Sequence, residues 1–414
     1  SMATQHPVAS VKDGDNYVAR LQKFPLKFQQ VLEGVRKREQ DGIVPPTFVV
    51  EKVLAEMRAF VAQPAQQNIL YTSLAEKIGK APQGAIDAEA GKRLLAQTQS
   101  AIDQQVYPVY RDMIAYYEQL LPKTAGNHGV WALPDGDAFY AWAVRQQTTT
   151  NMTPDQVHAL GLAEVARIEA EMDAILRAEG LTEGSVGARV KQLGTRPEQL
   201  YPDTDAARTQ ILADYQAAID EIDAGLKPYF NMRPKSGVKV ERVPTFREKT
   251  APGAYYNPPA FDGSRPGIFY ANLRNVAEVQ KFGMRTLAYH EAIPGHHFQI
   301  AIQQEMTGVP TFRKVLPFTA FSEGWALYAE RLAWEMGYQK QPLDNLGRLQ
   351  AEMFRAVRLV VDTGMHHKRW TREQAIEYMM DKTGMPETDV VAEIERYLDM
   401  PGQAPDHKES TNKI

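Results

Sequence analysis

The chain has 414 residues, of which 43% are hydrophobic and 24% charged, a composition that excludes disordered, collagen-like and disulfide-scaffold proteins. Its formal net charge is −4, from 47 basic and 51 acidic residues, so it lacks the excess of basic residues that is typical of proteins that bind nucleic acids. It contains no cysteine, and no apolar stretch approaches the roughly 18 residues of a transmembrane segment.

The first half of the sequence predicts helix after helix. Residues 1–14 resemble a tag remnant followed by a polar leader, and we exclude them from the fold. Apolar residues then recur with a period near 3.6 over residues 15–40, and Pro45-Pro46-Thr47 opens a second helix. Further amphipathic helices are expected over residues 85–121, 153–178 and 204–226.

The pattern changes over residues 235–272, where Val238, Val240 and Val243 alternate with polar residues. Residues 267–272 are expected to form a short strand after a loop rich in proline and glycine. Helical patterning resumes near residue 278 and continues to about residue 398. Because the composition does not shift sharply, we expect residues 15–414 to form a single, mainly α body with a small β-sheet.

Three of the nine histidines fall within eight residues, in the run Tyr289-His290-Glu291-Ala292-Ile293-Pro294-Gly295-His296-His297. In a zinc-hydrolase helix, two histidines four residues apart share one face, about 6 Å apart along the axis. The step of six from His290 to His296 points roughly 120° off that face in a regular helix. Pro294-Gly295 offers a remedy, since a bulge there could absorb two residues and bring His296 to the second ligand position.

A third ligand is expected from Ser322-Glu323-Gly324-Trp325-Ala326, at the start of a later apolar helix. Two histidines and one glutamate with an open fourth position are typical of a catalytic Zn²⁺ site, and nitrogen ligands favour zinc over Mg²⁺ or Ca²⁺. We therefore predict one Zn²⁺ held by His290, His296 and Glu323. Taken singly, a His-Glu pair on a helix more often lies on the protein surface without binding a metal, and Glu323 could be an acidic residue that stabilises a helix N-terminus through the helix dipole. His297 is expected to support the site from behind, with a swapped ligand role as the alternative.

These residues, with others, resemble a known family. The chain is similar to the bacterial family catalogued as domain of unknown function 885, a gluzincin-like group expected to be zinc peptidases. The resemblance rests on several motifs: Leu133-Pro134-Asp135-Gly136, Gln147-Thr148-Thr149-Thr150, Ala254-Tyr255-Tyr256-Asn257-Pro258-Pro259, His290 to Gln299, Phe321 to Ala326, Val361-Asp362-Thr363-Gly364-Met365-His366, and Pro401-Gly402-Gln403-Ala404. It implies a helical zincin-like metallopeptidase fold with the small sheet beside the zinc-binding helix.

The chain departs from the family pattern at both ends. The family usually has an additional N-terminal helical portion, so the body is expected to be truncated there and possibly at the C-terminus. A Tyr-Lys pair typically follows the Pro-Gly-Gln-Ala motif, whereas this chain has Pro405-Asp406-His407-Lys408. His407 then replaces a hydroxyl that would assist the reaction.

The expected reaction is hydrolysis of a peptide bond by metal-activated water, with Glu291 as the general base. An oxyanion donor is expected among His366, Tyr397 and Arg358, each of which could instead serve packing. Residues 267–272 are predicted to be an edge strand on which an extended peptide adds, with Tyr255, Tyr256, Tyr270 and Asn272 as substrate-binding residues.

The expected substrates are short or unfolded peptides, because the long helices before residue 235 should place the metal in a deep cleft. Two alternatives belong to other classes: a metal-binding but inactive lipoprotein-type protein, and a zinc hydrolase of a non-peptide amide or ester. We expect an extracytoplasmic location, periplasmic or lipid-anchored in the native form, with a cytoplasmic one as the alternative.

Overall fold

A computed structural model describes residues 2–405 apart from 125, 246–247, 249–250 and 317. Within it the chain divides into two compact units. The first unit comprises residues 1–127 and 132–134, and the second unit comprises residues 128–131 and 135–414. Two units therefore stand in place of the single body expected over residues 15–414. His407, expected in the position of a hydroxyl, lies outside the described residues.

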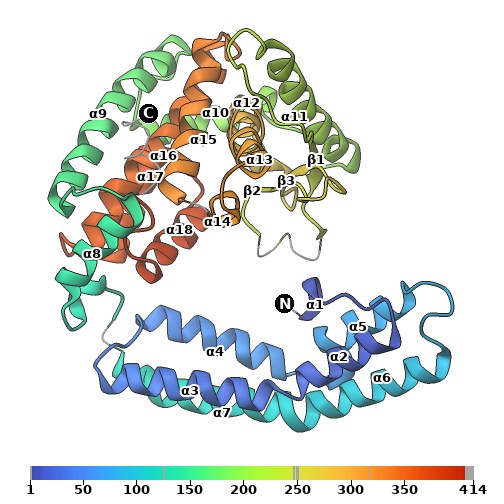
Figure 1. Ribbon diagram of the computed structural model, residues 1–414. Helices are drawn as coiled ribbons and strands as arrows, with labels where there is room; N and C mark the ends of the chain where they lie inside the picture. Colours follow the sequence, from blue (N-terminus) through green and yellow to red (C-terminus); the bar gives the residue numbers. More distant parts are fainter. Residues whose placement is uncertain (1, 125, 246–247, 249–250, 317, 406–414) are drawn as a thin grey trace. The chain divides into compact units, whose positions relative to one another are not determined.

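The first unit is helical, drawn in blue to cyan in Figure 1. Its α-helices are α1 (Met2–Gln5), α2 (Val11–Leu21), α3 (Phe24–Gln40), α4 (Thr47–Val61), α5 (Ile69–Gly79), α6 (Ala88–Ala101) and α7 (Tyr107–Leu120). One helix was expected over residues 15–40, but two form, because Pro25 has no backbone N–H and fits only in the first turn of α3. Between α6 and α7 the chain makes one π-helical turn, Ile102–Val106, just before Pro108.

The expected leader is part of this unit. His6 and Val8 are buried, and Ser10 caps α2 by accepting a hydrogen bond from the Asp13 backbone N–H. The Lys77 ammonium donates hydrogen bonds to the backbone carbonyls of Met2 and His6, which ties the segment to α5. Treating residues 1–14 as outside the fold was therefore wrong, because a polar composition does not prevent a segment from packing on a neighbouring helix.

The second unit contains the remaining helices and the sheet. Its α-helices are α8 (Gly136–Thr148), α9 (Pro154–Ala178), α10 (Val186–Gly194), α11 (Asp205–Gly225), α12 (Lys281–Glu291), α13 (His296–Glu305), α14 (Thr311–Val315), α15 (Thr319–Glu335), α16 (Pro342–His366), α17 (Arg372–Thr383) and α18 (Glu387–Asp399). The expected start of α9 is confirmed: Thr153 and Gln156 form a reciprocal capping box, and Pro154 occupies the first turn. Each described helix is too short or too polar to cross a bilayer.

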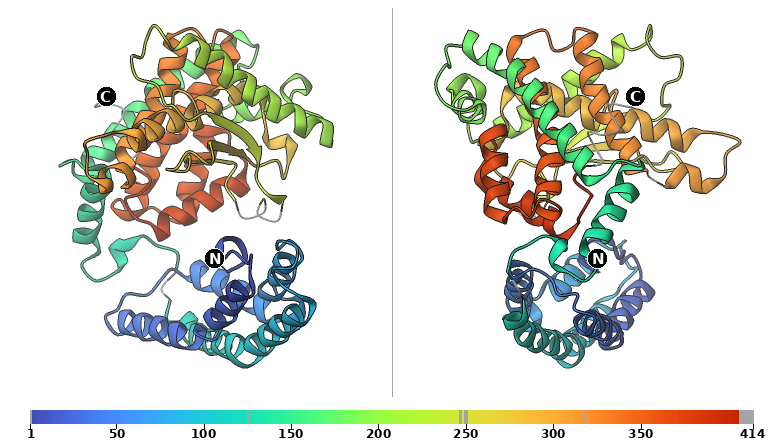
Figure 2. Two further views of the ribbon diagram at one scale, coloured as in Figure 1. Left: turned by 45° about the vertical axis from the view of Figure 1, so that its right-hand side comes forward. Right: turned by 90° about the vertical axis from the view of Figure 1, so that its left-hand side faces the viewer.

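The sheet has three strands, β1 (Val238–Arg242), β2 (Ala254–Asn257) and β3 (Gly267–Ala271), in the order β1-β3-β2. β3 pairs in parallel with β1, through Val240 and Phe269, and antiparallel with β2, through Tyr256 and Phe269. The prediction that residues 267–272 form an edge strand was therefore wrong, because both hydrogen-bonding edges of β3 are occupied. β1 packs against α11 and β2 against α12 (Figure 2), so the small sheet does lie beside the helix that carries His290.

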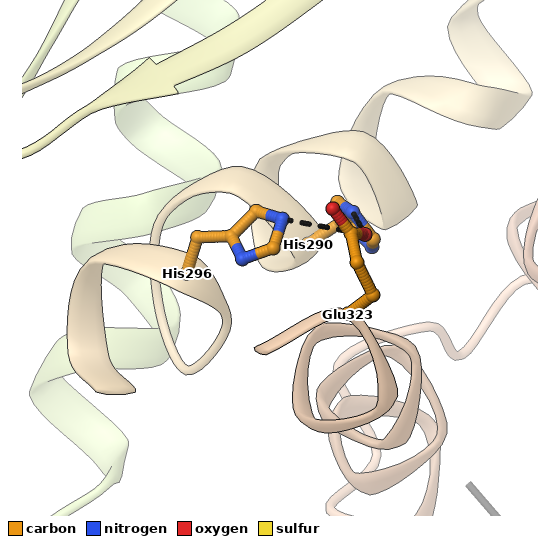
Figure 3. Close-up of side chains that lie close together, drawn as sticks. All are labelled: His290, His296 and Glu323. Atoms are coloured by element: carbon orange, nitrogen blue, oxygen red, sulfur yellow. Dashed lines mark ion pairs between the residues drawn. The ribbon is translucent and has the colours of Figure 1, made fainter. Parts of the chain in front are cut away.

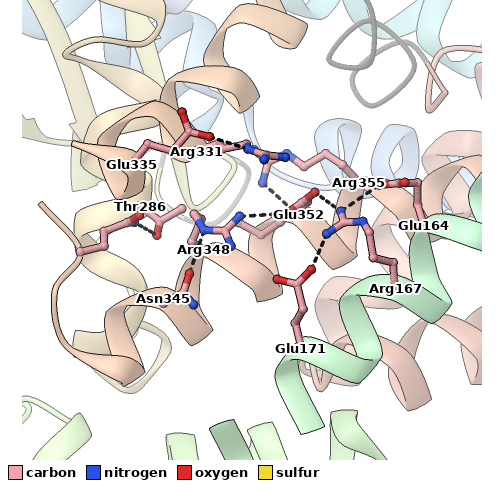
Figure 4. Close-up of polar contacts among 12 residues, drawn as sticks. Glu164, Arg167, Glu171, Thr286, Arg331, Glu335, Asn345, Arg348, Glu352 and Arg355 are labelled. Atoms are coloured by element: carbon pink, nitrogen blue, oxygen red, sulfur yellow. Dashed lines mark hydrogen bonds and ion pairs between the residues drawn. The ribbon is translucent and has the colours of Figure 1, made fainter. Parts of the chain in front are cut away.

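An ion-pair network, buried on its α16 side, joins α9 to α16 (Figure 4). Glu352 accepts hydrogen bonds from Arg348 at 2.9 Å and from Arg167 at 2.5 Å, and both Arg348 and Glu352 are buried. Arg167 also pairs with Glu164 and Glu171 on its own helix. Buried charges are tolerated only when paired in this way, so the network fixes how α16 lies against α9.

Candidate metal centre

The two candidate histidines flank a break between α12 and α13. α12 ends at Glu291, and α13 begins at His296, with a cis peptide bond between Ile293 and Pro294 in the turn. A bulge within one continuous helix was expected, but the chain ends one helix and starts another. The predicted result is nevertheless obtained, because the turn brings the imidazole rings of His290 and His296 to a centroid separation of 4.7 Å.

Gly295 makes this turn possible. A Cβ at position 295 would lie 2.0 Å from the carbonyl oxygen of His290 and 2.3 Å from that of Tyr289. Only glycine fits against these two carbonyls, since no backbone atom can give way cheaply there. The tight approach is what returns the chain to the end of α12 and sets His296 beside His290.

Glu323, in the first turns of α15, completes the group (Figure 3). One carboxylate oxygen, Oε2, lies 3.6 Å from His290 Nε2 and 3.7 Å from His296 Nε2, and all three ligand atoms lie within 4.8 Å of one another. Tetrahedral zinc with bonds of about 2.0–2.1 Å separates its ligand atoms by about 3.3 Å. Glu323 Oε2 is near this separation from each histidine, and the three side chains form a group that could hold a metal ion.

Glu330, two turns after Glu323 on α15, contacts His290 from the other side of the ring. Its Oε1 lies 2.8 Å from His290 Nδ1, and the two side chains are 1% and 4% exposed. Nδ1 therefore donates to the Glu330 carboxylate, and Nε2, the other ring nitrogen, faces Glu323. This is the carboxylate–histidine arrangement that fixes the tautomer and orientation of metal-binding histidines.

The charges around His290 bear on its protonation. Burial and the neighbouring Arg355 oppose a proton on the ring, but hydrogen bonds to Glu323 and Glu330 outweigh them and raise the pKa of His290 to about 9. Arg355 on α16 lies against the ring, with Nη2 3.2 Å from Nδ1, and 3.6 Å from Glu330 Oε1. The Arg355 guanidinium thus forms an ion pair with the Glu330 carboxylate that holds His290.

The start of α15 also holds the turn between the two histidines. The indole N–H of Trp325 donates to the Pro294 carbonyl at 2.8 Å. The Ser322 hydroxyl lies 3.5 Å from His296 Nδ1, on the side of the ring opposite the Glu323 contact. The short sequence Ser322-Glu323-Gly324-Trp325 therefore supplies the candidate ligand carboxylate, a contact to His296 and an anchor for the turn.

His297 points away from the group. Its Nε2 donates to the Ser236 carbonyl at 2.9 Å, and its Nδ1 lies 2.9 Å from the Tyr256 hydroxyl. The ring fills the space over Gly267, where a Cβ would be 2.5 Å from Nδ1. Both nitrogens of His297 are engaged with the sheet, an arrangement that favours His296 over His297 as the ligand.

Glu291, the expected general base, is the last residue of α12 and only 8% exposed. Burial, more than the neighbouring carboxylates of Glu323 and Glu330, raises the pKa of Glu291 to about 7. The buried Tyr215 of α11 is close enough for the charge of Glu291 to contribute, after burial, to the raised pKa of its phenol.

The structure does not bring the three expected oxyanion donors to a substrate. His366 is fully buried, and its two nitrogens are taken by the Val130 backbone N–H, at 3.1 Å, and the Tyr397 carbonyl, at 2.9 Å. Tyr397 is also fully buried, and its hydroxyl donates to Glu393 at 2.5 Å. The Arg358 guanidinium lies 5.4 Å from the Tyr397 ring centroid. Assigning His366 and Tyr397 to substrate was wrong, because both are enclosed by packing and their polar atoms are taken by hydrogen bonds inside the unit; Arg358 is buried against the Tyr397 ring, and its role as a donor to substrate stays a prediction.

The expected substrate-binding residues divide between the two faces of the sheet. Tyr255 and Tyr270 face each other across β2 and β3 and stack at 5.0 Å, whereas Tyr256 faces His297. Asn272 is buried, and its amide donates to the carbonyls of Glu248, Ala251 and Pro252. Asn272 therefore shapes the loop before β2, and its assignment to substrate was wrong; a substrate role for the three tyrosines stays a prediction.

Sequence reasoning missed Glu330 and Arg355. A sequence signal existed for Glu330: it follows Glu323 by seven residues, which places both carboxylates on one face of a helix, about 10.5 Å apart. Nothing in the local sequence distinguishes Arg355 from the other arginines of α16, since its position depends on how α16 packs on α12.

Taken together, these features define a mainly helical protein with a small three-stranded sheet and a group of two buried histidines and one half-buried glutamate that could hold a metal ion. The chain belongs to the family described as bacterial protein of unknown function (DUF885), whose family model matches residues 1–414. None of the curated proteins matches it.

The similar solved structures include two putative lipoproteins. A putative lipoprotein from Colwellia psychrerythraea has a TM-score of 0.93 and 41% sequence identity, over 100% of this chain and 70% of that chain. A putative lipoprotein of unknown function from Shewanella oneidensis has a TM-score of 0.71 over 97% of this chain and 71% of that chain. Its 17% identity supports the fold alone.

Proposed function

We propose that the protein is a zinc-dependent hydrolase that cleaves peptide bonds in short or unfolded peptides, with a zincin-like site. The observation that carries the proposal is the meeting of His290, His296 and Glu323 within 4.8 Å, with a buried carboxylate behind His290. Two histidines and a carboxylate leave a coordination position open, as catalytic zinc sites do and closed structural sites do not.

A bound Zn²⁺ would supply Lewis acidity, which activates water at neutral pH and polarises a carbonyl group. The protein's own residues prepare the rest. Glu330 holds His290 through Nδ1, so that Nε2 faces Glu323 and would coordinate the ion once deprotonated, and Gly295 and Trp325 hold His296 beside it. Glu291 follows His290 directly and is not in the ligand group. We assign it the role of accepting the proton of the attacking water and returning it to the leaving amine.

The recessed position of the ligands supports the choice of substrate. His290 and His296 are 4% and 8% exposed, so a scissile bond must enter the protein to reach them. A flexible peptide can do so, but a peptide bond held within a folded protein cannot. A peptide of about five residues should therefore be cut while a folded protein is spared.

The decisive test of the reaction is Glu291→Gln. The carboxamide preserves shape but cannot accept the proton, so turnover of peptides should fall by about 10²–10⁴-fold, the usual worth of a general base. Zinc content, measured on the same sample, should not change. Undiminished turnover would remove Glu291 from the mechanism, and no turnover of any peptide by the zinc-loaded parent protein would favour an inactive metal-binding protein.

We also propose an extracytoplasmic, lipid-anchored native form. The support is that the 41% identical relative from Colwellia psychrerythraea is described as a putative lipoprotein. In native cells the protein should then sediment with membranes and be released by detergent but not by high salt. Recovery in the soluble fraction of the cytoplasm would contradict this location.

A further inference from the structure

A large apolar cavity lies in the second unit beside the candidate metal centre. Its volume is about 1010 Å³, and side chains of α13, α14 and α15 contribute to its wall, among them Phe298, Ile302, Phe312, Phe321 and Trp325. This volume is at the upper end of the range of about 300–1,000 Å³ for small-molecule sites, enough for several side chains of a peptide. Phe312 and Phe321 are 55% and 52% exposed, an unusual placement for large apolar groups unless something covers them.

Ser322 lies between the cavity and His296 of the metal centre. This residue lines the cavity, its hydroxyl lies 3.5 Å from His296 Nδ1, and it directly precedes Glu323. Trp325, which holds the turn before His296, also lines the cavity. A chain bound in the cavity would therefore lie next to the group that we propose cleaves it.

Gln299 supplies a buried, unsatisfied acceptor in the same wall. Gln303 Nε2 donates to the Arg313 carbonyl at 2.7 Å, so Gln303 must turn its oxygen toward Gln299. Gln299 Nε2 donates to that oxygen at 2.7 Å, which leaves Gln299 Oε1 without a hydrogen-bond partner among the described residues. Gln299 is only 9% exposed, and a buried acceptor without a donor is costly. The two hydrogen bonds thus fix the orientation of the Gln299 amide, and its oxygen is an acceptor that an N–H or O–H group of a ligand would satisfy.

We propose that this cavity binds an apolar segment of the peptide substrate, with a backbone N–H of that segment donating to Gln299 Oε1. This inference rests on the proposed function, which supplies the peptide, and adds its substrate class. The apolar wall selects large hydrophobic side chains, and the Gln299 acceptor selects an amide over a plain acyl chain. The charged side chains in the wall, Arg313 and Lys314, are both basic, so peptides with lysine or arginine in the segment are rejected.

The test measures binding of five-residue peptides to the full zinc-loaded chain by calorimetry, with turnover followed in parallel. A peptide with adjacent Phe and Leu should bind at least about tenfold more tightly than its Ser-substituted or Lys-substituted counterpart. Phe312→Asp should abolish this preference. Phe139→Asp is the matched control, because Phe139 is 45% exposed in the same unit but does not line the cavity.

The hydrogen bond is tested separately with Gln299→Leu. This variant should bind the apolar peptide about five- to tenfold more weakly, the worth of one such bond. N-methylation of one backbone nitrogen of the peptide should weaken binding to the parent protein by a similar factor and cause no further loss in Gln299→Leu. If N-methylation at every position weakens binding to the parent protein and to Gln299→Leu by the same factor, the Gln299 contact is refuted.

The outcomes separate this inference from the proposed function. Turnover of peptides with no preference for apolar residues would overturn the cavity assignment and leave the hydrolase standing. Apolar peptides that bind as described but are never cut would sustain the cavity assignment and sink the hydrolase. Decanoate is the competing ligand. If it binds as tightly as the apolar peptide and displaces it, the cavity binds acyl chains and the assignment to a peptide segment is overturned.

Discussion

Glu330 should set the affinity of the site for zinc although it is not a ligand. Its carboxylate accepts from His290 Nδ1 at 2.8 Å, between groups that are 1% and 4% exposed. A hydrogen bond to a charged partner contributes about 1.5–3 kcal/mol, which corresponds to about 10–100-fold in a binding constant. Loss of the partner of a metal-binding histidine weakens affinity over the same range.

Two variants separate the contribution of the Glu330 charge to zinc affinity from that of its hydrogen-bond acceptor. Glu330→Gln keeps an acceptor for Nδ1 but removes the charge, so zinc affinity should fall about tenfold. Glu330→Leu removes the acceptor as well, and affinity should fall by nearer 100-fold. Zinc affinity is measured by competition with a chromophoric chelator, on samples whose helical circular dichroism matches the parent protein.

Glu335→Gln is the matched control for this series. It makes the same chemical change on the same helix, at a side chain that is 44% exposed and pairs with Arg331 (Figure 4). Its zinc affinity should equal that of the parent. If Glu330→Leu also binds zinc as the parent does while remaining folded, the supporting role of the carboxylate is refuted.

Two further changes test the turn and the interior. Gly295→Ala should cost the protein its zinc while the helices survive, because the new Cβ would lie 2.0 Å from the His290 carbonyl oxygen; metal content measured beside circular dichroism checks this, and full zinc content would contradict it. Burial lowers the pKa of His366 to about 4 from an unfolded value of 6.5, so the unfolded chain binds this proton first and stability falls by up to about 3 kcal/mol as pH drops from 6.5 to 4. His366→Gln, which can keep both backbone hydrogen bonds without titrating, should lose less stability over that pH range in urea denaturation, and an unchanged pH dependence would refute the assignment.

Local rules were sufficient where a feature depends on neighbours in the sequence. The start of α9 follows from Thr153 and Pro154, and the residues of β1 and β3 follow from alternation and a preceding loop. The place of β3 in the sheet did not follow, because the strand order β1-β3-β2 is set by pairing between distant segments. The break between α2 and α3 could have been read from Pro25, whose missing N–H rules out a helix interior.

The candidate site also combines features that follow from the local sequence with features that depend on packing between distant segments. His290, His296 and Glu323 were predicted from spacing and from a Pro-Gly pair, and the structure brings these three together. His366 and Tyr397 carry suitable chemistry, but only packing decides whether such groups meet a substrate, and here packing and hydrogen bonds enclose them. Arg355, one turn before Arg358 on α16, contacts the site because it lies on the side of the helix that meets His290.

The central claim is that one Zn²⁺ is held by His290, His296 and Glu323. Elemental analysis of purified His296→Ala and His297→Ala, side by side with the parent protein, tests it most directly, because the two histidines are adjacent and only one faces Glu323. We expect one zinc per chain in the parent and in His297→Ala, and none in His296→Ala. Zinc retained by His296→Ala and lost from His297→Ala would contradict it.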